Sequence, residues 1–155
     1  MAASVIPKCY SGRQPCIDNL KVTMTSRPLV VVVEDDPASR KTLGRVLQAG
    51  GFASLLYASA EDFIERPPDR PFVGLLLDLH LGGMSGLDLQ DRLRRQGSSV
   101  PVVVITAFDD PVSRGMAEQL GCVAFLNKPC DAETILGVLR TLDPERPTAK
   151  ADSGL

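Results

Sequence analysis

The sequence has no excess of basic charge and no long apolar run, and each absence excludes a class of protein. With 17 Lys and Arg against 19 Asp and Glu, the formal net charge is −2, whereas nucleic-acid binding requires a basic patch or stripe. No apolar stretch approaches the roughly 20 residues that span a bilayer, and residues 1–27 lack the apolar segment of a signal peptide. We therefore expect a cytoplasmic protein that contacts neither nucleic acid nor membrane.

Cysteine and histidine are also scarce. The four cysteines, Cys9, Cys16, Cys122 and Cys130, fit no zinc spacing. We expect free thiols in a reducing compartment, because a domain of this size needs no disulfide, although a Cys9–Cys16 pair is an alternative. The only histidine, His80, lies in a predicted loop, which favours an exposed side chain over a direct catalytic role.

The 155 residues suffice for one domain with a proper core and are too few for two ordinary ones. Regular patterning is confined to the middle of the chain. We therefore expect a flexible extension over residues 1–27, one domain over 28–143 and a disordered tail over 144–155.

Within that domain, an apolar run, a turn and a segment with helical spacing follow one another five times. The apolar runs are nearly continuous in Val, Leu and Ile, which is typical of strands buried on both faces. Alternation of strand and helix predicts a doubly wound α/β domain with a five-stranded parallel sheet. The strands are predicted at about 29–34, 52–56, 72–77, 101–105 and 123–126.

Helix starts are marked by capping residues. Asp36 and Asp110 each precede a proline, which favours a cap followed by the first helical position. Ser59 and Asp131 are predicted caps of two further helices. In the helix that follows Asp110, the apolar residues share one face: Val112, Met116 and Leu120.

Polar residues follow four of the five strands. They are the acidic cluster Glu34-Asp35-Asp36, then Asp78, Thr106 and Lys128. Because parallel strands share one carboxyl edge, where open α/β sheets build their sites, we expect these side chains to meet.

Carboxylates at one site repel each other unless a cation is present. Mg²⁺ takes oxygen ligands from one or two carboxylates and from phosphate, so Glu34, Asp35 and Asp78 are candidate ligands. A carboxylate there can also attack phosphorus. Lys128 and Thr106 would then stabilise the phosphoryl oxygens.

Four stretches carry a family resemblance: LVVVVEDDP at 29–37, LLLDLHLGGMSGLDL at 75–89, VVVITA at 102–107 and AFLNKP at 124–129. In their order and spacing, the sequence resembles the receiver domain of bacterial two-component response regulators. The resemblance covers residues 29 to 142 and implies a flavodoxin-like strand order, 2-1-3-4-5.

The resemblance also implies residue roles. Asp78 would accept a phosphoryl group from a phosphohistidine of a sensor histidine kinase or a histidine phosphotransfer protein. Asp35 would bind Mg²⁺ directly and Glu34 through water, and the backbone carbonyl of His80 would be a third metal contact. Asp36 competes with this acidic pair, but the spacing and the following proline favour it as a helix cap.

A switch is implied as well. Thr106 would follow the phosphoryl group inward and Phe125 would change rotamer with it. Since phenylalanine lacks the hydroxyl of tyrosine, the change would be read by packing alone. Ala107, in the same motif as Thr106, is a further candidate site residue, and the peptide bond before Pro129 resembles the family's cis bond.

The sequence departs from the family pattern at Gly82, where a proline is usual, and this should loosen the loop after the third strand. His80 and Phe108 are bulky groups beside the site. We expect them to limit the access of water to an acyl phosphate.

The last helix has an apolar stripe that is most simply core, yet is wide enough that part of it is a candidate partner surface. The stripe comprises Ile135, Leu136, Val138, Leu139 and Leu142.

These features favour a stand-alone response regulator that switches binding to a downstream protein or relays phosphate, with the face from the fourth to the fifth helix as a candidate homodimer surface. One alternative is a binding module that is not phosphorylated. Another is a phosphatase that forms an aspartyl phosphate, but such enzymes have a second Asp where this chain has His80.

Overall fold

A computed structural model describes residues 27–145 of the chain. The predicted N-terminal extension, apart from Arg27, lies outside the described residues, as do Cys9 and Cys16. Of the predicted C-terminal tail, only residues 144–145 are described. The other two cysteines, Cys122 and Cys130, are free thiols, and burial raises the pKa of each.

The core of the described region is a parallel sheet of five strands in the order β2-β1-β3-β4-β5. This confirms the predicted fold class and strand order. Each strand starts or ends within two residues of its predicted limits, because apolar runs extend slightly beyond the hydrogen-bonded ladder. The strands are β1 (Leu29–Val33), β2 (Ala53–Tyr57), β3 (Gly74–Leu77), β4 (Val102–Thr106) and β5 (Ala124–Asn127).

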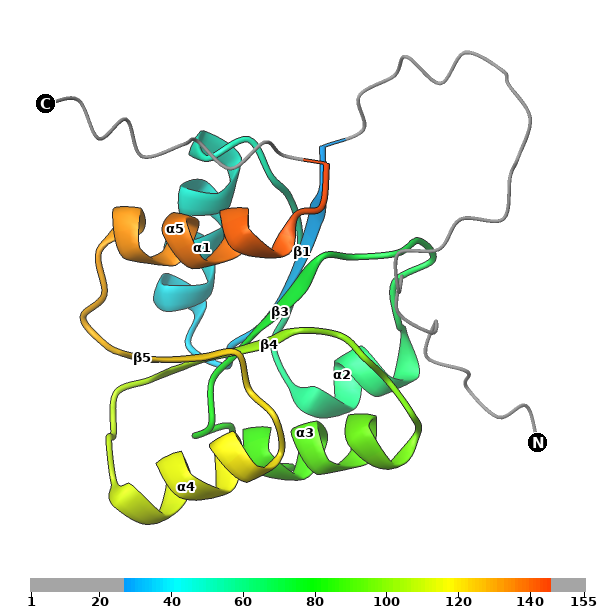
Figure 1. Ribbon diagram of the computed structural model, residues 1–155, viewed down its shortest axis with the longest axis vertical. Helices are drawn as coiled ribbons and strands as arrows, with labels where there is room; N and C mark the ends of the chain where they lie inside the picture. The colour runs from blue at the N-terminus through cyan, green and yellow to red at the C-terminus, as the bar shows by residue number, and fades with distance from the viewer. Residues whose placement is uncertain (1–26, 146–155) are drawn as a thin grey trace, which may run out of the picture.

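Five helices cover the two faces of this sheet. Figure 1 shows α1 and α5 on one face and α2, α3 and α4 on the other, so the protein has three layers. The helices are α1 (Pro37–Ala49), α2 (Ala60–Glu65), α3 (Gly86–Arg95), α4 (Pro111–Gln119) and α5 (Ala132–Leu142).

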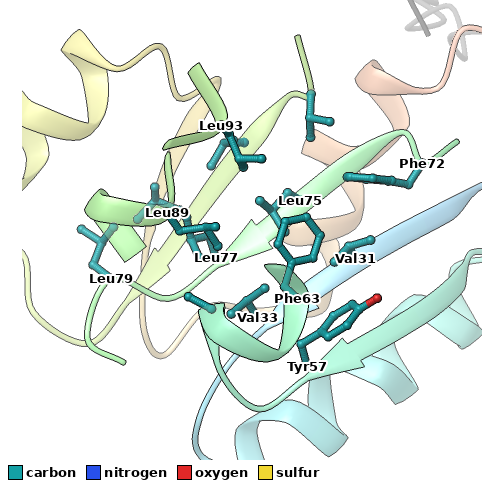
Figure 2. Packing of buried hydrophobic residues seen from close by; sticks show 14 of the residues in the cluster. Val31, Val33, Tyr57, Phe63, Phe72, Leu75, Leu77, Leu79, Leu89 and Leu93 are labelled. Atoms are coloured by element: carbon teal, nitrogen blue, oxygen red, sulfur yellow. The ribbon is translucent and has the colours of Figure 1, made fainter. Parts of the chain in front are cut away.

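The sheet separates two apolar cores. Alternate residues of β1 point to opposite faces, so Val31 packs with α2 and α3 while Val30 packs with α1 and α5. On the first face, the ring of Phe63 packs edge-to-face against the rings of Tyr57 and Phe72, with 5.4 and 6.3 Å between the ring centroids. Figure 2 shows these rings beside the leucines of β3. The fully buried β1 and β3 strands form a rigid base for the residues that follow them.

The predicted caps are confirmed at Asp36, Ser59, Asp110 and Asp131, each of which accepts a hydrogen bond from the backbone N–H three residues later. For Asp36 the distance to the Ser39 nitrogen is 2.8 Å. This bond lowers the pKa of Asp36. The structure therefore gives Asp36 the capping role that its sequence context favoured.

The apolar stripe of α5 belongs to the core. Its members Ile135, Leu136 and Leu139 are buried, and Val138 and Leu142 pack against the same cluster. The expectation that the stripe is core is therefore confirmed for its buried members, and a partner role for part of it stays a prediction. The stripe is wide because α5 packs on apolar residues of the sheet and also contacts α1. By contrast, the apolar face of α4 is exposed, with Val112 71% and Met116 47% accessible.

Gly86, the first residue of α3, lies against the backbone that carries the residues after β3. A Cβ atom built on Gly86 would lie 2.3 Å from the carbonyl oxygen of Asp78 and 2.8 Å from the Cα atom of Leu79. The Gly86 N–H also donates to the Leu79 carbonyl at 3.1 Å. Helix α3 can therefore approach the end of β3 this closely only because residue 86 has no side chain.

We predict that Gly86→Ala lowers the free energy of unfolding by about 1–3 kcal/mol, because the backbone after β3 must shift to admit the methyl group. Gly137→Ala is the matched control. Gly137 lies inside α5, and a Cβ atom built on it would meet nothing within 4 Å outside its own helix, so alanine there should stabilise by about 0.5–1 kcal/mol. Urea denaturation measures the free energy of unfolding of both variants, and equal changes in the two would contradict this explanation of Gly86.

Candidate functional site

The candidate site lies at the carboxyl edge of the sheet. In the parallel register, Val33 of β1 is paired with Leu77 of β3, so the residues that follow them, Glu34 and Asp78, are neighbours. The Asp78 N–H donates to the Val33 carbonyl at 3.1 Å. On the other side, the Lys128 N–H donates to the Thr106 carbonyl at 2.8 Å. The ends of β1, β3, β4 and β5 thus meet at one place.

Three carboxylates gather there. Each of Glu34, Asp35 and Asp78 offers one oxygen, and these three atoms lie within 4.8 Å of one another. Glu34 is 1% and Asp78 7% exposed, whereas Asp35 faces solvent. A set of oxygen ligands that is partly buried and open on one side fits a hard divalent cation, which keeps several waters.

One ammonium group lies between two of these acids. The Lys128 Nζ atom is 2.5 Å from Glu34 Oε2 and 3.1 Å from Asp78 Oδ2. Burial raises the pKa of Glu34, and the hydrogen bonds from Lys128 and from the Asp36 N–H offset only part of that rise. Burial opposes the charge on Lys128, but its bonds to Glu34 and Asp78 raise the pKa of the ammonium. Lys128 is therefore a cation held between two acids.

Backbone groups orient the carboxylates. Asp78 Oδ1 accepts from the His80 N–H at 2.9 Å, and Asp35 Oδ2 accepts from the Gly82 N–H at 3.3 Å. Arg40 of α1 donates from its Nη1 atom to the carbonyls of Glu34 at 2.8 Å and Asp35 at 3.2 Å. The acidic segment and the loop after β3 are thereby linked to each other.

The remaining predicted residues surround this cluster. Thr106 is fully buried, and its Oγ1 atom accepts from the Phe108 N–H at 3.3 Å. Ala107 is exposed. The His80 side chain is also exposed, and its ring contacts the ring of Phe108 edge-on at 4.9 Å. The peptide bond before Pro129 is cis, as the resemblance implied.

Phe125 lies at the centre of a contact that sequence reasoning missed. The guanidinium of Arg114, from α4, lies 4.4 Å from the centroid of the Phe125 ring. Arg114 also makes two hydrogen bonds to Asp109, at 3.0 and 2.9 Å, and Asn127 makes a third at 2.9 Å. The bonds from Arg114 and Asn127 lower the pKa of Asp109. The loop before α4 is thus tied to β5 next to the predicted switch residue.

A second missed residue is Glu61, whose Oε1 atom accepts from the Met84 N–H at 2.7 Å. In the sequence, Glu61 is an acid in the first turn of a short helix, which has a local explanation in the helix dipole. Arg40 and Arg114 are likewise ordinary helix-surface arginines in the sequence. None of the three had a local signal that pointed to the site.

An order 2-1-3-4-5 parallel sheet with acids, a threonine and a lysine at its carboxyl edge defines the receiver class of α/β proteins. The sequence model of the response regulator receiver domain matches residues 30–140. The chain therefore belongs to the response regulator receiver domain family.

Relatives and solved structures agree with this. The chain is 28% identical over 131 residues to the transcriptional regulatory protein FixJ of Bradyrhizobium diazoefficiens and 32% identical over 124 residues to the acid tolerance regulatory protein ActR of Sinorhizobium medicae. These alignments cover 84% and 76% of this chain, and 64% of each relative. The chain thus spans somewhat less than two thirds of both relatives, and the expectation of a stand-alone regulator stays a prediction.

Among solved structures, the chemotaxis protein CheY4 of Vibrio cholerae has a TM-score of 0.68 at 21% identity, with 76% of this chain and 99% of that chain covered. A sensor protein from Polaromonas sp. JS666 has a TM-score of 0.66 at 29% identity, with 75% and 95% covered. The first likeness concerns the fold alone.

Membership gives the general function, which is that of a receiver domain in two-component signalling. Receiver domains are signalling switches that interact with histidine kinases or phosphotransfer proteins, and they bind Mg²⁺ at an acidic pocket. The corresponding acidic cluster is present here.

Within residues 27–145, no helix has the length and apolar character to cross a membrane. The expected cytoplasmic location and lack of nucleic-acid contact stay predictions.

We predict that Lys128→Met destabilises the fold by about 1–3 kcal/mol at pH 8, because Glu34 is left buried without its ammonium partner. Burial already holds the pKa of Glu34 above its ordinary value, and loss of Lys128 raises it further. The loss of stability is complete at pH values above the raised pKa of Glu34, where the folded protein holds an unpaired buried carboxylate. It disappears as the pH falls toward about 4.3, the pKa of a glutamate in the unfolded chain.

The difference between Lys128→Met and the unaltered protein should therefore shrink between pH 8 and pH 5. Urea denaturation at both pH values measures it, with Lys41→Met, an exposed position of α1, as the control. A difference that does not vary with pH would show that Glu34 is not the group left unpaired.

Proposed function

We propose that Asp78 is the phosphoryl acceptor of this receiver domain and that the transfer depends on Mg²⁺. The observation that carries the proposal is the position of the Asp78 carboxylate, with one oxygen on the His80 N–H and the other on Lys128. An Asp78 oxygen attacks phosphorus, the bond from phosphorus to the donor histidine breaks, and the imidazole leaves with the electron pair. The nucleophile is thus fixed in place before the donor arrives.

The surrounding residues take the roles that their positions support. Asp35 and Asp78 would hold the metal ion directly and Glu34 would do so through water, and the His80 carbonyl would be a further ligand. When bound, the cation supplies positive charge beside the phosphoryl oxygens. Lys128 lies within reach of the same oxygens and neutralises the charge that develops on them. Thr106 would supply its hydroxyl from the end of β4.

The phosphorylated state is then read at α4. Movement of Thr106 toward the phosphoryl group would let the Phe125 ring move, and Arg114 stacks on that ring while it binds Asp109. A change at Phe125 would therefore reposition α4. The exposed apolar residues of this region are candidates for contact with a downstream protein, a phosphotransfer protein or a second copy. They are Phe108, Val112, Met116 and Val123.

A receiver-like binding module that is not phosphorylated is the remaining alternative. The phosphatase alternative loses support, since the chain belongs to a family of switches and His80 replaces the acid that such enzymes need two residues after the acceptor.

We predict that the protein, incubated with Mg²⁺ and acetyl phosphate, forms an adduct that is stable to acid and labile to base. Asp78→Asn should abolish the adduct, because an amide is not a nucleophile toward phosphorus. Intact-mass spectrometry measures it, with Asp69→Asn, an exposed position in the loop before β3, as the control. An adduct that persists in Asp78→Asn would refute the assignment, and none in the unaltered protein would favour the binding module.

We further predict that His80→Ala and Phe108→Ala each shorten the lifetime of the phosphorylated form. The two rings contact each other, and the His80 N–H donates to Asp78, so removal of either ring should admit water to the acyl phosphate. An increase in hydrolysis of up to about tenfold corresponds to about 1.4 kcal/mol in the barrier. Loss of radiolabel with time measures it, with Val112→Ala on α4 as the control. Unchanged lifetimes in both variants would rule out this shielding role.

A further inference from the structure

The loop from Asp78 to Ser85 carries the acceptor and has little rigidity of its own. It contains Gly82 and Gly83, and Gly83 adopts a φ of +96°, which side-chain-bearing residues rarely take. Glycines have more conformational freedom to lose than other residues. Holding this loop in one conformation therefore requires contacts from outside it.

Glu61 of α2 supplies such a contact. Its Oε1 atom accepts from the Met84 N–H at 2.7 Å, the short distance of a bond to a charged acceptor. The same oxygen would be 2.7 Å from a Cβ atom on Gly83, so the carboxylate packs directly on the glycine. The Met84 side chain in turn packs against the apolar core between the sheet and α2 and α3. The bond from the Met84 N–H also lowers the pKa of Glu61, because it favours the charged carboxylate.

The other end of the loop is bound to the acidic cluster. The Gly82 N–H donates to Asp35 and the His80 N–H donates to Asp78. The Gly82 bond is long, at 3.3 Å, and by itself fixes the loop weakly. Two residues later, the Met84 bond holds the same chain at a short distance. Glu61 thus holds the loop two residues after Gly82, at the short Met84 bond.

We propose that Glu61 is a positioning residue for the phosphoryl-transfer site. It contacts neither the acceptor nor the acidic cluster, and acts by holding the loop after β3 so that its backbone groups face Asp35 and Asp78. The inference rests on the proposed phosphorylation of Asp78. It also accounts for how a glycine-rich loop keeps the backbone around an acceptor in one geometry.

Three variants of Glu61 separate position from charge. Glu61→Ala removes the acceptor of the Met84 N–H. Glu61→Asp keeps the negative charge at the start of α2 but withdraws the oxygen by one methylene, and Glu61→Gln keeps an oxygen at the same reach. Asp62→Ala is the matched control in the same turn, since the Asp62 carboxylate pairs with the exposed Arg66 at 3.0 Å.

With acetyl phosphate and saturating Mg²⁺, we expect Glu61→Ala and Glu61→Asp to take up phosphate about tenfold more slowly, within the roughly 100-fold that a 1 Å misplacement can cost. Glu61→Gln should restore most of the rate, and Asp62→Ala should match the unaltered protein. In amide hydrogen exchange, the Met84 N–H should lose protection in the Ala and Asp variants and keep it in the Gln variant. If Glu61 acted only on overall stability, the slow variants would have a lower unfolding midpoint, and Glu61→Gln would not restore the rate of phosphorylation.

Unchanged phosphorylation in Glu61→Ala and Glu61→Asp would overturn the inference, as would a Glu61→Gln variant as slow as Glu61→Ala. If the unaltered protein takes up no phosphate, the proposed function of Asp78 fails instead. The exchange of the Met84 N–H distinguishes these cases, because it reports on the loop without phosphorylation.

Discussion

The site depends on one electrostatic constraint: three carboxylates meet at one edge of the sheet, and the Lys128 ammonium lies between two of them. Without a cation, buried acids this close would repel one another or take up protons. Lys128 compensates the two buried members, while the exposed Asp35 leaves the cluster open toward solvent. The arrangement places negative charge where a divalent cation can bind and, under the proposed function, a positive group beside the phosphoryl oxygens.

The rest of the fold maintains this geometry. The register of β1 with β3 makes Glu34 and Asp78 neighbours, and full burial of both strands prevents a slip that would reverse their faces. At Gly86 the absence of a side chain lets α3 approach the backbone of Asp78. A contact from α2, through Glu61, fixes the loop that follows. Helices on one face of the sheet therefore contribute to the position of Asp78, the proposed acceptor.

The strands, caps and acidic cluster were predictable because their signals are local. A continuous apolar run marks a buried strand, Asp36 before Pro37 marks a helix start, and a charge directly after a strand marks the sheet edge. The contacts of Glu61 and Arg114 were not predictable, since each joins elements whose separation only the tertiary structure sets. The stripe of α5 was ambiguous for a similar reason: its width reflects two buried neighbours, which the periodicity of one helix cannot distinguish from a partner.

A Mg²⁺ titration followed by nuclear magnetic resonance would show whether the three carboxylates act as one cation site. If they do, the protein binds Mg²⁺ at one saturable site, and the shifts are confined to the amides near Glu34, Asp78 and Lys128. Asp35→Asn should weaken binding by roughly tenfold or more, a loss of at least about 1.4 kcal/mol. Equal affinity in the unaltered protein and in Asp35→Asn, or shifts centred elsewhere, would contradict it.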